Sequence, residues 1–139
     1  MKRMIIAAEI LMAASAFAGG NIGINSYLPD GTLWRFETYT DTNDHWDSTK
    51  SENPPLSVKR AKDLAISFMG KVPRDPGIIE WRLSAITLQK MSDEPEHWIY
   101  VIRFIALHSG AWTGPAQEFT VLVRFDGSIP EPLIEKPLK

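Results

Sequence analysis

The stretch that runs from His97 to His108, His-Trp-Ile-Tyr-Val-Ile-Arg-Phe-Ile-Ala-Leu-His, says most about the fold. It is rich in β-branched and aromatic residues, and it contains one arginine, Arg103, but no lysine, aspartate or glutamate. A run of this length that is apolar on both alternating faces is typical of a strand inside a sheet. We therefore expect a central strand, and we expect its Trp98–Phe104 face to pack on a helix.

Strand-like segments flank this central run on both sides. Residues 78–91 alternate at first, but Ile86 and Leu88 break the alternation, which indicates either a bulge or an outward apolar spot. Residues 118–125 alternate throughout, and Asp126-Gly127 then predicts a hairpin turn into a short return over residues 128–133. A further half-buried strand is predicted over residues 32–40, after the turn Pro29-Asp30-Gly31.

One helix is predicted, and it begins after Ser57, a good N-cap residue. Gly70 is its expected end. The apolar side chains that fall on one stripe at helical spacing are Val58, Ala61, Leu64, Ala65 and Phe68. One helix lying on a four- to five-stranded antiparallel sheet, in the order βαβββ, is the expected α+β fold. Pro130, Pro132 and Pro137 predict an extended tail or a blunted edge strand at the C-terminus.

The N-terminus has the order of a secretory signal peptide. Lys2 and Arg3 are cationic, residues 4–14 are mostly apolar, and Ala16-Phe17-Ala18 ends the stretch in small residues. We expect residues 1–18 to be removed, leaving a single periplasmic or secreted domain over 19–139 with an ordered core at about 27–133 and no stable membrane anchor. Glu9 interrupts the apolar run, so a retained amphipathic helix is the alternative.

Composition excludes several function classes. The net charge of −2 argues against a nucleic-acid partner, which requires a basic face. The chain has no cysteine that could act as a nucleophile, and no serine lies in the Gly-x-Ser-x-Gly motif of serine hydrolases. The acidic loop 41–52 resembles a calcium loop only in part, because Trp46 stands where the sharp turn requires glycine. We therefore expect no enzyme activity, cofactor or bound metal.

Three segments carry a resemblance to a known group of proteins. They are the helix over residues 57–65, the strand over residues 98–104, and the strand and Asp-Gly turn over residues 119–129. Together they resemble the cystatin-like folds, and more particularly small exported bacterial PepSY-like domains. The resemblance implies an extracytoplasmic module with a peptidase-restraining or protein-partner role and no catalytic residues. Cystatin-type inhibition is disfavoured, because the expected first hairpin turn, residues 92–96, lacks the Gln-x-Val-x-Gly motif.

Five residues are candidates for contact with a partner. Trp46 and Trp112 fall in loops, where an aromatic side chain is available as an anchor. Val101, Arg103 and Ile105 lie on the strand face opposite the helix, which predicts an exposed interaction surface.

Two neighbouring strands are expected to enlarge this outer face, through Ile86 and Leu88 on one side and Leu122 on the other. A homodimer is one predicted use of the face. The alternative is that residues 21–28 or the proline-rich tail cover it. The function expected overall is a non-enzymatic exported domain that binds a protein or peptide. A small ligand-binding or catalytic cone-shaped α+β domain is the alternative.

Overall fold

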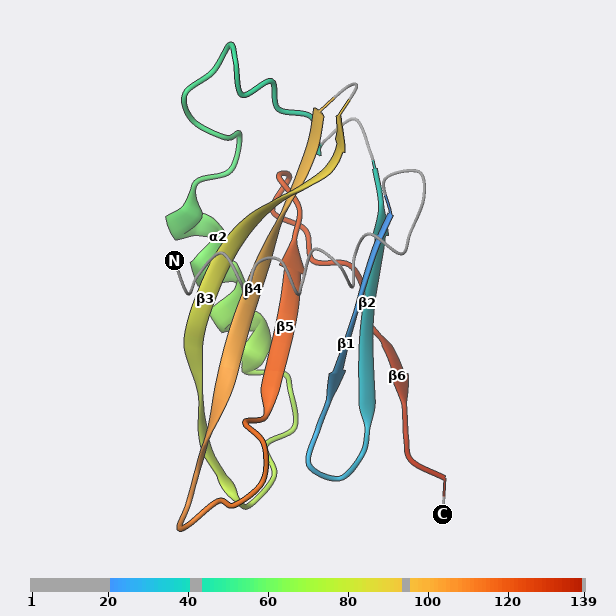
Figure 1. Ribbon diagram of the computed structural model, residues 1–139, viewed down its shortest axis with the longest axis vertical. Coiled ribbons are helices and arrows are strands. Elements are labelled where there is room, and N and C mark those ends of the chain that lie inside the picture. Colours follow the sequence, from blue (N-terminus) through green and yellow to red (C-terminus); the bar gives the residue numbers. More distant parts are fainter. Residues whose placement is uncertain (1–20, 41–43, 94–95, 139) are drawn as a thin grey trace.

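The computed structural model describes residues 21–40, 44–93 and 96–138. Within them the chain forms one α-helix and six strands, which are divided between two three-stranded antiparallel sheets (Figure 1). The expected cleavage after Ala18 and the alternative of a retained N-terminal helix lie outside the described residues. Among the described residues, no helix is long and apolar enough to cross a bilayer.

The first sheet has the order β1–β2–β6 and contains β1 (Asn21–Tyr27), β2 (Leu33–Tyr39) and β6 (Leu133–Glu135). The predicted turn Pro29-Asp30-Gly31 joins β1 to β2. Asp30 Oδ1 accepts the backbone N–H of Thr32 at 2.8 Å, and Gly31 has a φ of 87°. Because that φ lies in the left-handed region, glycine is the residue that suits this corner.

The second sheet has the order β3–β4–β5 and contains β3 (Ile78–Asp93), β4 (Glu96–His108) and β5 (Glu118–Val123). The prediction that residues 97–108 form the central strand is confirmed. A register shift between Leu83 and Ala85 places Ile86 opposite Ile102 and Leu88 opposite Tyr100. Ile86 and Leu88 therefore lie on the helix side of the sheet, so a bulge explains the broken alternation, and they do not enlarge the outer face.

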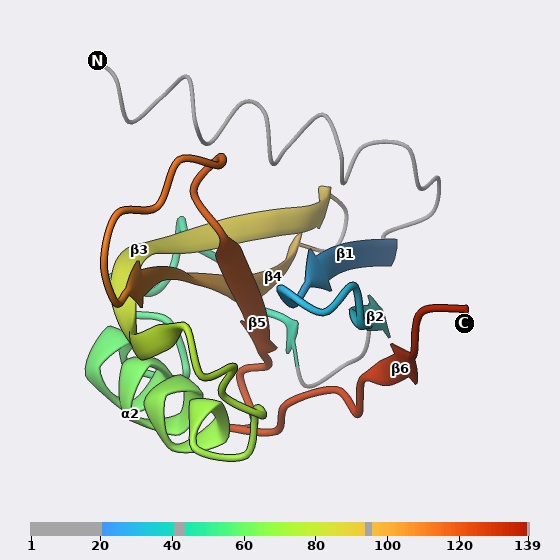
Figure 2. The same ribbon diagram turned by 90° about the horizontal axis from the view of Figure 1, so that it is seen from below.

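The helix α2 (Val58–Met69) begins where the sequence predicts. The Ser57 hydroxyl accepts the backbone N–H of Arg60 at 3.1 Å, which satisfies one of the free donors of the first turn. The helix ends at Gly70, whose φ of −63° is right-handed rather than left-handed. Ala61, Ala65 and Met69 are buried. Seen from below, α2 lies across one face of the β3–β4–β5 sheet (Figure 2).

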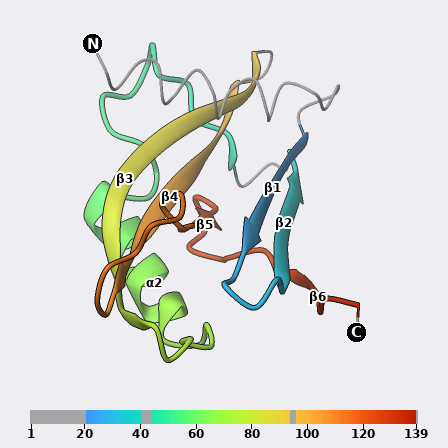
Figure 3. The same ribbon diagram turned by 60° about the horizontal axis from the view of Figure 1, so that its bottom comes forward.

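The two sheets and the helix share one aromatic core. Phe119 of β5 contacts Trp34 and Phe36 of β2, at centroid separations of 5.6 and 6.2 Å. Phe68 of α2 also meets both of these β2 rings, at 6.2 and 5.5 Å. In Figure 3, β1 and β2 stand beside β5. The β1–β2–β6 sheet therefore packs beside α2 and covers the part of this core that α2 leaves open.

The expectation of a single four- to five-stranded sheet is wrong; the fold is α+β with one helix and two three-stranded sheets. The Asp126-Gly127 turn does form, since Arg124 N donates to Ser128 O at 2.9 Å. However, residues 128–132 form no strand against β5. The chain instead crosses to the other sheet, where Ile134 of β6 lies opposite Trp34 of β2.

Candidate functional site

A cleft of about 670 Å³ lies between the C-terminal half of α2 and the beginning of β3. Phe104 of β4, which is almost fully buried, contributes to its lining. Ile66 and Met69 belong to the α2 wall, and Trp81 and Leu83 belong to the β3 wall. The lining is mainly apolar, and the linker from Gly70 to Arg74 also borders the cleft.

Trp81 lines this cleft and has a buried hydrogen-bond donor without a partner among the described residues. Its ring contacts Phe119 with centroids 5.8 Å apart, which anchors the indole against the core. Its Nε1 is buried and has no hydrogen-bond partner in the described part of the chain. A buried donor without a partner costs about 1–3 kcal/mol.

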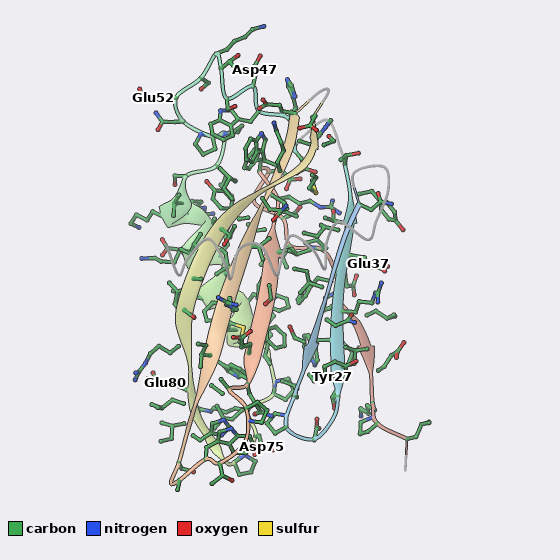
Figure 4. All side chains as sticks on the ribbon, viewed as in Figure 1. Tyr27, Glu37, Asp47, Glu52, Asp75 and Glu80 are labelled. Carbon is green, nitrogen blue, oxygen red and sulfur yellow. The ribbon has the colours of Figure 1, made fainter. Side chains whose placement is uncertain are left out.

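The linker end of the cleft carries net positive charge. Arg74 Nη1 donates to the backbone oxygen of Ile79 at 2.6 Å, which holds the guanidinium against β3. Glu80 is already paired with Arg82 at 2.8 Å. Within the described residues, neither Lys71 nor Arg74 takes part in an ion pair. Figure 4 shows Glu80 and Asp75 near this same end of β3.

The β3 wall of the cleft is also a sheet edge. In the order β3–β4–β5, β3 has a described strand neighbour on one side only, and Figure 1 shows no strand to the left of β3. The seven residues from Leu83 to Gln89 contain no charged residue, proline or glycine. Charge and proline are common devices that stop an edge strand from pairing with another chain, and this stretch has neither.

Trp46 lies at the opposite end of the molecule and is less exposed than predicted. Its ring packs against Trp98, with centroids 5.4 Å apart, and against Phe125 at 6.3 Å. Beside it, the rings of His45 and His97 lie 6.0 Å apart. The contact between these two histidines could not be predicted, because 52 positions separate them and no local spacing links them.

Glu96 holds the loop that carries Trp46. Its carboxylate accepts the backbone N–H of Ser48 at 3.2 Å, the Ser48 hydroxyl at 3.0 Å and the indole N–H of Trp98 at 3.2 Å. The backbone hydrogen bond from Ser48 is the largest of several causes that lower the pKa of Glu96. This end of the molecule is therefore a docked loop, and its ion pairs join Lys50 to Asp47 and Lys90 to Asp93 and Glu96.

Trp112 is an exposed aromatic residue with a fixed orientation. Its ring stacks on His108 with centroids 4.1 Å apart and planes 5° from parallel, and 48% of the residue remains exposed. Its Nε1 donates to the backbone oxygen of Pro115 at 2.8 Å. Trp112 and Trp46 lie near opposite ends of β4, because their partners there are His108 and Trp98. The structure does not bring these two candidates together.

The predicted outer face is only partly a surface. Val101 is 1% exposed, so the expectation that it faces solvent is wrong. Its cross-strand neighbours, Thr87 and Leu122, flank it from both sides because β4 is the central strand. Arg103 forms an ion pair with Glu118 at 3.6 Å. Ile105 is half-buried and lines a smaller hollow of about 250 Å³.

The described part of the chain contains no candidate metal centre. In residues 21–40, 44–93 and 96–138, no group of three or more His, Asp or Glu side chains is arranged to hold an ion. Comparison of the sequence with protein-family models and with curated proteins, and of the structure with solved structures, finds no match. The cleft between α2 and β3 is therefore the candidate functional site, and the sequence did not predict it.

Proposed function

We propose that this chain is an exported, non-enzymatic domain that binds an extended segment of a protein or peptide. The segment adds to the free edge of β3 and places side chains over the cleft beside α2. One observation supports this function above the others: Trp81 and Leu83 belong both to the open edge strand and to the wall of the apolar cleft.

Strand addition explains why an edge and a cleft together make a useful site. The backbone of the added segment pairs with the unpaired N–H and C=O groups of β3, which provides affinity without regard to sequence. Alternate side chains of a strand point to the same face, so every second residue of the partner projects toward α2. The apolar lining then selects for apolar side chains at those alternate positions.

The helix wall provides a variant that tests the function without removing core packing. Ile66 is 48% exposed and lines the cleft, so Ile66→Glu places a charge there at little cost to folding. Val58 on the same helix is 51% exposed and does not line the cleft, so Val58→Glu is a matched control. Both variants are prepared as exported protein from the full-length gene, which also allows its N-terminus to be determined by mass spectrometry.

The probe is an array of random decapeptides, with binding measured by fluorescence of the labelled protein. We expect the wild type and Val58→Glu to select the same peptides, which have apolar residues at alternate positions, and Ile66→Glu to lose them. Amide resonances of residues 79–85 should shift when a selected peptide is added. Binding that depends equally on both helix positions, or shifts confined to other elements, would overturn the proposed site.

A further inference from the structure

We infer that the bound segment ends in a free C-terminal carboxylate, which Lys71 and Arg74 hold at the linker end of the cleft. The inference rests on the proposed function and adds the chemistry of the partner to it. Three features of the structure carry it: the direction of β3, the position of the linker, and the unpaired positive charge there.

The direction of β3 decides which end of the partner meets the cations. All strand pairs in the described sheets are antiparallel, and antiparallel pairing is slightly the more stable arrangement. β3 starts at Ile78, close to Arg74, and runs away toward Asp93. A segment added antiparallel to β3 therefore has its carboxyl end beside Arg74.

The linker between α2 and β3 favours a chain end over a chain that continues. Residues 70–77 run from the end of the helix on one wall to the start of the strand on the other, so they close the cleft at this end. Val72 of this linker is 5% exposed, which ties it to the core. A partner whose side chains fill the cleft is therefore expected to terminate at the linker.

The charges at this point suit an anion. Free carbonyl groups at the C-terminal end of α2 would carry partial negative charge and repel an anion. Here Ser67 O, Phe68 O and Met69 O already accept the N–H groups of the three residues that follow the helix. Lys71 and Arg74 are exposed and, within the described chain, have no carboxylate partner. A carboxylate held by a lysine and an arginine forms charge-assisted hydrogen bonds, which are stronger than neutral ones.

The test uses decapeptides attached through their N-termini and synthesised in pairs, one with a free carboxylate and one with a carboxamide. The proteins compared are the wild type, Lys71→Glu, Arg74→Glu and the control Lys136→Glu, whose exposed lysine lies beyond β6. We expect amidation to weaken wild-type binding about tenfold or more, and each cleft variant to show a similar loss for the free acids. The control should match the wild type.

Each other outcome overturns a defined part of the argument. If wild-type protein binds neither form of any peptide, the proposed function itself is wrong. If it binds acid and amide equally, the function stands and the carboxylate inference fails. If amidation matters but neither Lys71→Glu nor Arg74→Glu weakens binding, the carboxylate is held elsewhere and the assignment to these two residues is wrong.

Discussion

Ser26 Oγ of β1 accepts the backbone N–H of Thr120 of β5 at 2.9 Å, in a buried position where the two sheets meet. The two strands belong to different sheets and do not pair as a ladder. A side chain therefore takes the place of the backbone acceptor that a neighbouring strand would normally supply. Between β1 and β5, this side-chain contact stands where a backbone ladder would join the two sheets into one.

Replacement of Ser26 by alanine should destabilise the fold by removing this contact between the two sheets. The Thr120 N–H would remain buried without an acceptor, which costs about 1–3 kcal/mol. We expect the free energy of unfolding, measured by urea denaturation, to fall by that amount. Asn25→Ala on the exposed side of the same strand is the control and should change it by under about 0.5 kcal/mol. Equal behaviour of the two variants would show that Ser26 does not satisfy the Thr120 N–H.

The contact between β1 and β5 belongs to the part of the fold that could not be predicted from the sequence. Strong local patterns in the sequence marked five elements. Apolar residues recur at helical spacing in α2 and alternate in β5 and at the start of β3, β2 mixes aromatic with polar residues as a half-buried strand does, and β4 is apolar on both faces. The segment Asn21-Ile-Gly-Ile-Asn-Ser-Tyr27 has few strand-forming residues, so β1 had no such signal. Its pairing with β2 and the buried contact of Ser26 with Thr120 decide its structure, and neither can be predicted from the residues of β1 alone.

The candidate site was predictable to a smaller extent. Trp112 was identified as an exposed loop aromatic, and the structure agrees. The cleft was not predicted, because it depends on where α2 lies relative to β3 and on the bulge that sets which β3 side chains face it. Lys71 and Arg74 had no distinguishing pattern in the sequence. Only the fold places both at the linker end of the cleft.

Tyr100→Phe should release the segment that precedes α2. The Tyr100 hydroxyl donates to the backbone oxygen of Leu56 at 2.6 Å, and its loss should cost about 1 kcal/mol of unfolding free energy. Proteolysis or hydrogen exchange before the N-cap should also become faster. Thr38→Val, which removes a buried hydroxyl with only a 3.5 Å contact, is the comparison and should cost less.

The same tyrosine predicts a loss of stability at alkaline pH. Burial raises the pKa of Tyr100 above 10.0, so the folded protein keeps this proton at pH values where the unfolded chain has lost it. The contribution is complete below about pH 10 and is lost as the pH rises through the folded-state pKa. The fall in melting temperature above pH 10 should be shallower in Tyr100→Phe than in the wild type. Parallel curves would contradict this assignment.

Glu96 predicts the opposite dependence at acidic pH. Its pKa is lowered below 4.5, first by the backbone N–H of Ser48 and further by the Ser48 hydroxyl, Trp98 and Lys90. The stabilisation is present above about pH 4.5 and is lost as the pH falls through the folded-state pKa. The amide resonance of Ser48 should follow this titration, and Glu96→Gln should abolish it. Glu52→Gln, at the exposed far side of the same loop (Figure 4), should leave the titration unchanged.

Gly114 should control the orientation of Trp112. A Cβ added at Gly114 would lie 2.8 Å from Cζ2 of the Trp112 ring, so Gly114→Ala requires the ring to move. The ring is partly exposed and can swing away, so we expect a small change in stability and a loss of the stacking on His108. The His108 ring protons report this directly, because the parallel indole shifts their resonances upfield. Trp112→Leu should remove the same upfield shift, whereas Ala116→Gly, at an exposed position of the same loop, should retain it. An unchanged His108 spectrum in Gly114→Ala would mean that the stacked arrangement does not persist in solution.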